Sequence, residues 1–125
     1  MQGVGAGTVT FQRDVIVNAG DTANTFNENV ILDGLTFTSD EDITFGDSSS
    51  DQVDLSTAAV IIDTSASDAN ITFYSKIDGN QDLTVNSGSG TTAFNGVVGG
   101  VTPLSSITTD IDGETDIGAD LTTQD

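Results

Sequence analysis

Residues 71–83 read Ile-Thr-Phe-Tyr-Ser-Lys-Ile-Asp-Gly-Asn-Gln-Asp-Leu, and this stretch decides the fold. Residues 92–104 repeat its pattern 21 residues later, as Thr-Ala-Phe-Asn-Gly-Val-Val-Gly-Gly-Val-Thr-Pro-Leu. Each copy reads as a short strand, a glycine turn and a second strand. The alignment matches four pairs of residues: Phe73 with Phe94, Ile77 with Val98, Gly79 with Gly100, and Leu83 with Leu104. A period of this length is typical of solenoids, in which each repeat packs only against its neighbours.

A second pattern, an apolar residue followed by Thr and Phe, recurs along the chain. In a β-strand, the first and third residues of such a triplet point to one face and the middle residue points to the other. Each copy therefore predicts a short strand with two buried side chains and one exposed threonine. The four copies are Val9-Thr10-Phe11, Leu35-Thr36-Phe37, Ile43-Thr44-Phe45 and Ile71-Thr72-Phe73, and the looser copies Val53-Asp54-Leu55 and Leu83-Thr84-Val85 keep the alternation.

Composition supports an all-β fold, because Thr and Asp are abundant while strong helix formers are scarce. We predict one segment over residues 1–125, a right-handed parallel β-helix (β-solenoid) of about six irregular coils. Both ends are expected to be uncapped, with residues 1–8 and 122–125 irregular. Turns of the Asp-Gly type also begin two-residue hairpins, so an antiparallel β-sandwich is the alternative fold.

The net charge of −18, from 20 acidic residues against Arg13 and Lys76, excludes several partners. Phosphate backbones and anionic lipids both need cations on the protein, so we expect no nucleic-acid or membrane-surface binding. No stretch is apolar enough to span a bilayer, and residues 1–7 do not have the pattern of a signal peptide. The absence of cysteine excludes a disulfide framework.

Residues 71–88 resemble a repeat of very large bacterial exoproteins of the filamentous-haemagglutinin type. Residues 92–110, with the order Phe, Gly-Gly, Thr-Pro-Leu, resemble the companion repeat of those arrays. The resemblance covers residues 71–125 well and residues 8–63 loosely. It implies a secreted or cell-surface bacterial stalk that serves adhesion, biofilm or filament structure, and it carries no catalytic residues.

Catalysis is not expected. Without histidine or cysteine the chain can form neither a Ser-His-Asp nor a Cys-His arrangement, and it lacks the best zinc ligands. A pair of carboxylates could still cleave a polysaccharide, as in glycosidases. One Tyr, no Trp and two cations are too few to hold a sugar chain, so we predict a protein that is not an enzyme.

Calcium is the candidate ligand, because alternate oxygen side chains around a glycine turn suit a hard cation. Gly113 provides that turn, and the candidate ligands are Asp110, Asp112, Glu114 and Asp116. Two further acidic stretches, residues 40–42 and 78–82, have weaker patterns. The alternative interpretation of all three is acidic side chains solvated at turns.

The outward threonines of the triplets, Thr10, Thr36, Thr44 and Thr72, raise the hypothesis of a water-ordering or ice-binding face. No regular Thr-x-Thr array recurs from coil to coil, so ordinary outward threonines are the preferred interpretation.

We therefore predict a non-enzymatic structural or adhesive segment that acts as a rigid stalk or filament element outside the cell. Its expected partners are neighbouring repeats, or copies of itself through open solenoid ends, and a surface glycan is a further candidate. The alternatives are a filament subunit that joins end to end and a calcium-stabilised carbohydrate-binding module.

Overall fold

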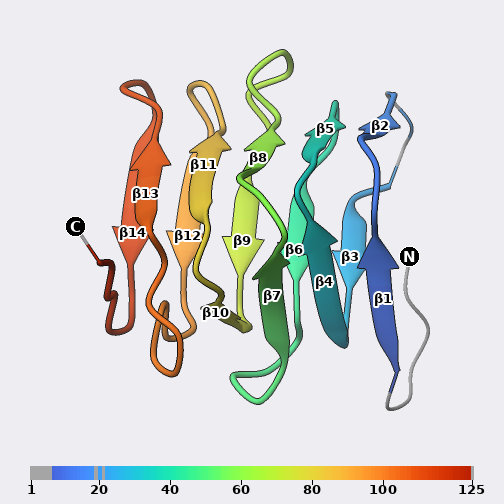
Figure 1. The fold of residues 1–125 in the computed structure, drawn as a ribbon. Coiled ribbons are helices and arrows are strands. Elements are labelled where there is room, and N and C mark those ends of the chain that lie inside the picture. The colour runs from blue at the N-terminus through green and yellow to red at the C-terminus, as the bar shows by residue number, and fades with distance from the viewer. Residues whose placement is uncertain (1–6, 19, 21, 125) are drawn as a thin grey trace.

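A computed structural model of the chain, which describes residues 7–18, 20 and 22–124, is a β-solenoid. Every strand pairing in it is parallel, so the antiparallel sandwich is wrong. The chain runs up the front strands of Figure 1 and down those behind while advancing from right to left, which makes the coil right-handed. The described residues contain no helix that is long and apolar enough to cross a membrane.

Three sheets form the walls of the solenoid: sheets B and C take one strand from each of five coils, and sheet A takes one from each of the first four. Sheet A contains β1 (Thr8–Phe11), β4 (Asn29–Asp33), β7 (Gln52–Ser56) and β10 (Lys76–Asp78). Sheet B contains β2 (Val15–Val17), β5 (Thr36–Ser39), β8 (Val60–Asp63), β11 (Asp82–Asn86) and β13 (Ser106–Thr109). Sheet C contains β3 (Asn24–Phe26), β6 (Ile43–Phe45), β9 (Ile71–Phe73), β12 (Thr91–Phe94) and β14 (Glu114–Ile117).

The solenoid has about five turns, close to the predicted six. Single-residue bridges continue sheet A beyond β10, from Ile77 to Val98 and from Val98 to Leu121. A further bridge joins Leu104 to Thr123, so residues 121–124 begin a sixth turn. At a strand spacing of about 4.8 Å, five layers span on the order of 20–25 Å. Most of residues 1–8, which were expected to be irregular, lie outside the described residues.

The predicted repeat register is confirmed in part. Phe73 lies over Phe94 in sheet C, and Ile77 lies over Val98 in sheet A. The pairing of Leu83 with Leu104 is wrong, because Leu83 pairs with Ile107. The loop after Val98 is longer than the corresponding loop after Ile77 in the previous coil. The next strand therefore pairs three residues later than the 21-residue alignment predicts.

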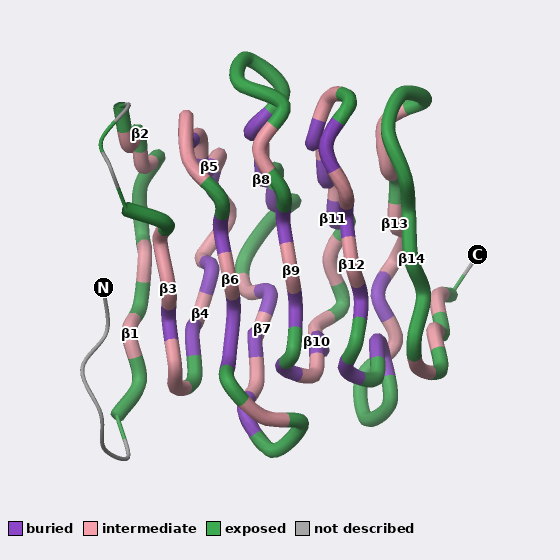
Figure 2. The backbone as a smooth tube through the Cα atoms, turned by 180° about the vertical axis from the view of Figure 1, so that it is seen from behind, coloured by how far each residue is buried: buried purple, intermediate pink, exposed green. Residues whose placement is uncertain are grey.

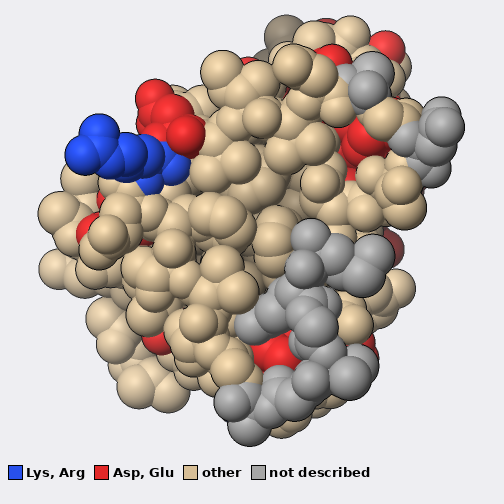
Figure 3. Space-filling view, turned by 90° about the vertical axis from the view of Figure 1, so that its right-hand side faces the viewer, with Lys and Arg blue, Asp and Glu red and all other residues tan. Residues whose placement is uncertain are grey.

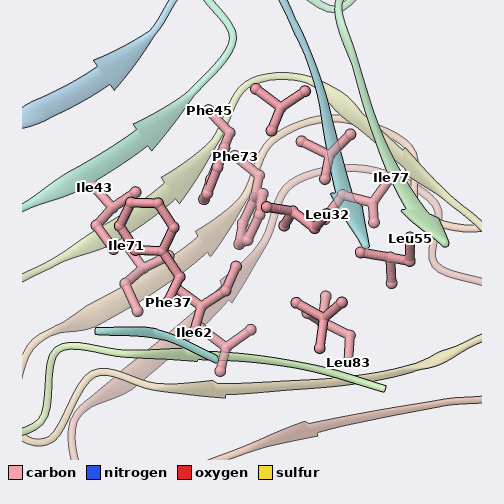
Figure 4. Packing of buried hydrophobic residues seen from close by; sticks show 14 of the residues in the cluster. Leu32, Phe37, Ile43, Phe45, Leu55, Ile62, Ile71, Phe73, Ile77 and Leu83 are labelled. Atoms are coloured by element: carbon pink, nitrogen blue, oxygen red, sulfur yellow. The ribbon is translucent and has the colours of Figure 1, made fainter. Parts of the chain in front are cut away.

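The core consists of inward side chains stacked in columns along the solenoid axis (Figure 4). Phe26, Phe45, Phe73 and Phe94 form one column in sheet C. Their rings stack with centroids 5.0–5.5 Å apart and planes 5–20° apart. Offset stacking of this kind stabilises beyond area burial alone, by about 0.5–1.5 kcal/mol per pair.

The triplet prediction is confirmed for burial in three of the four copies. In β6 and β9 the first and third residues are buried and the threonine is half-buried. Leu35, just before β5, and Phe37, within it, are buried in the same way, whereas Val9 and Phe11 of the first copy are only half-buried. The copies do not share one wall, however: residues 9–11 lie in sheet A, residues 36–37 in sheet B, and residues 43–45 and 71–73 in sheet C.

Candidate functional site

The four predicted calcium ligands lie at the last coil and do not surround a common point. Asp110 is half-buried, and its Oδ2 accepts a hydrogen bond of 2.5 Å from the backbone N–H of Gly88 in the previous coil. Asp112, Glu114 and Asp116 are exposed. Within the described part of the chain, no group of three or more acidic side chains is placed to hold a metal ion. Calcium binding therefore stays a prediction, which a thermal melt with calcium and with chelator tests.

The other two acidic stretches also bond to backbone amides of a neighbouring coil. In residues 40–42, Glu41 Oε1 accepts from the N–H of Gly20 at 3.0 Å, and Asp42 Oδ1 accepts from the N–H of Asn70 at 2.7 Å. In residues 78–82, Asp78 Oδ1 accepts from the N–H groups of Val101 and Thr102, at 2.9 and 3.0 Å.

These contacts belong to a set that we call the inter-coil caps: hydrogen bonds from a backbone N–H of one coil to a side-chain oxygen of an adjacent coil. The bonded residues are 21–28 positions apart in sequence. Besides the caps at Asp110, Glu41, Asp42 and Asp78, the set contains Asp14 with Thr36, Asn29 with Gln52, Asp68 with Ser89, and Asn70 with Thr91, at 2.8–2.9 Å. Bonds from N–H to a carboxylate are charge-assisted and stronger than neutral ones.

Many of the acids therefore belong to the framework, because their carboxylates accept hydrogen bonds from backbone N–H groups of an adjacent coil. Sequence reasoning missed this role because the amide that each carboxylate reaches depends on the coil register. One signal was present: Asp42, Asn70 and Thr91 recur at the same corner of successive coils, and each of the first two caps the next residue of the series.

One carboxylate acts within its own loop instead. Asp51 Oδ2 accepts from the N–H groups of Asp47 and Ser48, both at 3.0 Å, and from Ser48 Oγ at 3.1 Å. Burial raises the pKa of Asp51, but these hydrogen bonds outweigh it, and the pKa lies below its ordinary value of 3.8. The bonds hold the loop between β6 and β7 in its turn.

The outward threonines do stack, but only in part. Thr25, Thr44 and Thr72 lie in register on the outer face of sheet C, and Ala93 and Asp116 continue the column. Thr10 lies on sheet A and Thr36 on sheet B, so the four predicted positions face three directions. They form no single face for water or ice.

The first coil exposes an apolar hollow at the end of the solenoid. Inward side chains of all three walls line this hollow of about 290 Å³: Val9, Phe11, Val15, Val17, Asn24, Phe26 and Phe37. Figure 3 looks onto this end, where uncharged atoms make up most of the described surface. Sequence reasoning missed Phe26 as a wall residue, because Asn24 stands where the other triplets carry an apolar residue and bonds to Ser39 Oγ at 2.8 Å.

The comparisons with known proteins yield no relative. No family model matches the sequence, no curated protein matches it, and no solved structure matches the fold. The likeness to filamentous-haemagglutinin repeats therefore rests on the residues quoted above.

Proposed function

We propose that the chain is a non-enzymatic structural segment, a rigid spacer in the stalk of a secreted or surface-bound bacterial protein. The observation that carries the proposal is the unbroken connection of coil to coil along the axis. Inward residues form continuous columns, such as Val9, Val30, Val53, Ile77, Val98 and Leu121 in sheet A. A molecule built in this way keeps its two ends apart at a fixed distance.

The rigidity has two independent sources. Parallel ladders join neighbouring coils in each wall, so that backbone groups are satisfied between coils. The inter-coil caps add bonds at the corners, where the chain leaves one sheet for the next. A turn that is bonded to the coil beside it cannot swing away without breaking a charge-assisted hydrogen bond.

The exterior suits a passive role outside the cell. A net charge of −18 keeps the protein soluble and discourages association with other anionic surfaces. The chain has two cationic side chains, and backbone N–H groups instead of cations pair with many of the carboxylates. The lack of histidine and cysteine supports a function without covalent chemistry.

Spin-label distances test the rigidity directly, because a chain without cysteine accepts two unique labels. Thr25→Cys and Asp116→Cys lie in one outward column of sheet C, four layers apart, or roughly 19 Å at about 4.8 Å per layer. We expect a single narrow distance distribution in solution. A broad or bimodal distribution, with circular dichroism unchanged, would contradict a rigid spacer.

The position of the protein needs a separate experiment in the source organism. An antibody against the chain is applied to intact and to permeabilised cells, and bound antibody is viewed by electron microscopy. We expect label on intact cells, at a distance from the surface. Label that requires permeabilisation contradicts the stalk role.

A further inference from the structure

We propose that Asn70 is an N-glycosylation site, at which the side-chain nitrogen carries a sugar. The acceptor pattern for this modification is Asn, any residue except Pro, and then Ser or Thr. Residues 70–72 read Asn-Ile-Thr, and no other asparagine of the chain is followed at the second position by Ser or Thr. The pattern is short, so its side chains must also be placed where a transferase can use them.

The three residues of the acceptor pattern alternate across the wall formed by sheet C. Ile71 points inward and is fully buried, with 0% exposure. Asn70, which precedes β9, is exposed, and Thr72 within β9 is half-buried. Because residues two apart in an extended chain share a face, the Asn70 amide and the Thr72 hydroxyl lie on the same outward side of the wall. The acceptor amide and the hydroxyl of the pattern are therefore presented together.

The two polar atoms of the Asn70 side chain have different surroundings. Its Oδ1 accepts a hydrogen bond of 2.8 Å from the N–H of Thr91 and so forms one of the inter-coil caps. Its Nδ2 makes no hydrogen bond to any residue that the structure describes. Asn24 differs, because its Nδ2 donates to Ser39 Oγ at 2.8 Å. A sugar on the Asn70 nitrogen thus replaces a hydrogen that is not used within the described framework, and it leaves the cap intact.

The modification forms one bond and breaks one. Nδ2 of Asn70 attacks the anomeric carbon of an activated sugar, the bond from that carbon to a phosphate oxygen breaks, and the nitrogen loses one proton to a base of the transferase. The co-reactant is a sugar that is linked through phosphate either to a lipid or to a nucleotide. An amide nitrogen is a weak nucleophile, because resonance delocalises its lone pair into the carbonyl group. The transferase supplies the activation, and this chain supplies the acceptor.

The corner around Asn70 has room for a bulky group. Residues 65–68 are exposed, as is Asn70 itself. The loop between β8 and β9 covers residues 64–70 and extends past its neighbours at the top of Figure 1, whereas the loop between β11 and β12 covers only residues 87–90. A glycan is bulky and hydrophilic, so at this corner it shields an exposed loop of the kind that proteases cleave. The value of that shield rests on the proposed function, because a stalk outside the cell meets proteases there.

Mass spectrometry of the chain purified from the source organism tests the proposal. Trypsin cleaves after Arg13 and Lys76, so one peptide of residues 14–76 contains Asn70. We expect this peptide to be heavier by whole sugar residues, and fragmentation by electron transfer to place the added mass on Asn70. Modified chain inside the cell identifies a nucleotide-linked donor, whereas modification that appears only after export identifies a lipid-linked donor.

Matched variants in the same organism separate the acceptor role from a structural one. Asn70→Asp keeps an oxygen for the Thr91 cap but removes the amide nitrogen, so the added mass should be lost while the fold is kept. Thr72→Val keeps the shape of the side chain without its hydroxyl and should also lose the added mass, whereas Thr72→Ser should retain it. Asn95→Asp changes an exposed asparagine outside the pattern and should leave the modification unchanged.

Circular dichroism confirms that each variant is folded before its mass is measured. Unmodified mass for the peptide of residues 14–76 overturns the proposal. So does added mass that persists in Asn70→Asp or Thr72→Val, because the acceptor pattern is then not what directs the sugar. None of these outcomes bears on the spin-label distance or on antibody binding to intact cells, so the spacer function and the glycosylation site can fail separately.

Discussion

Strands β12 and β14 are neighbours in sheet C, but β12 lies between two strands whereas β14 is the outermost strand among the described residues. Phe94 in β12 is 1% exposed, whereas Ile117, its partner in β14, is 54% exposed. Thr92 is buried in β12, and its partner Thr115 is exposed. Figure 2 shows the same difference along the whole molecule, with buried residues concentrated in the inner coils. An inward side chain in this fold is thus fully buried only where a coil lies on each side of it. Its contribution to the free energy of unfolding therefore depends on its place along the solenoid axis.

Truncation of the phenylalanine column should show the largest difference between inner and outer coils. Phe73→Ala removes a ring that stacks on Phe45 and Phe94 and should lower the free energy of unfolding by about 3–5 kcal/mol. Ile117→Ala in the same column should cost under about 1 kcal/mol, because that side chain is half exposed. Urea denaturation measures both. Equal losses would mean that coverage by the next coil is not what buries the column.

Two glycines, one in an inner coil and one in the last coil, should differ in how tightly the backbone of the previous coil crowds them. Gly79 has φ of +128°, and a Cβ there would lie 2.2 Å from the carbonyl oxygen of Leu55 in the previous coil. Gly79→Ala should therefore cost about 2 kcal/mol or more. Gly118→Ala in the last coil, where the nearest atom is the side-chain Oδ1 of Asn95 at 3.2 Å, should change stability by under about 1 kcal/mol. A Gly79→Ala variant as stable as the parent contradicts the tight approach of the two coils.

The inter-coil caps sharpen the comparison for acidic residues. Asp78 is 3% exposed and holds two backbone N–H groups of the next coil, so Asp78→Ala should cost about 1–3 kcal/mol. Asp112→Ala, at an exposed position of the last coil, should have no measurable cost or a small gain from reduced repulsion. Thermal melts of the two variants at one pH distinguish them. The cap assignment fails if both variants melt with the parent.

Asp51 should contribute the smallest of these effects, visible as a dependence on pH. Its pKa is lower in the folded chain than in the unfolded one, so the folded state binds the proton less readily. The stabilisation is complete above pH 3.8 and is lost as pH falls through the lowered pKa. Asp51→Asn should flatten this part of the stability curve and cost under about 1 kcal/mol at neutral pH. A stability curve that Asp51→Asn leaves unchanged would remove the assignment.

The sequence predicts the walls of this solenoid better than the corners. Alternation in the triplets identifies inward residues. The 21-residue alignment gives the correct register for Phe73 with Phe94 and for Ile77 with Val98, because the same number of residues separates the two positions in each coil. The pairing of Leu83 was wrong because the residues after Val98 lengthen one corner. Triplets of the same apolar-Thr-Phe pattern occupy different walls, since the pattern encodes a strand but not its place in the coil.

The functional residues were harder to predict for a related reason. Alternate acids around Gly113 suit a cation, but whether four carboxylates converge depends on where the coil places them. In the structure Asp110 points to an amide of the previous coil, at 2.5 Å from the Gly88 nitrogen. No sequence pattern predicted the hollow of the first coil, because inward residues show the same alternation whether or not a neighbouring coil covers them.

The unequal corner loops have a practical consequence for engineering. Phe45 and Phe73 stack although 28 residues separate them, and Phe73 and Phe94 stack across 21. The strands of sheet C thus pair in register even though the corner loops between them differ in length. Foreign peptides grafted at residues 65–67, which are exposed and precede the inter-coil cap of Asp68, should be displayed without disturbing the fold. Grafts at the corresponding corners of several coils would form a row along the solenoid axis, with a spacing of about 4.8 Å per coil. A single chain would then display several peptides at regular intervals.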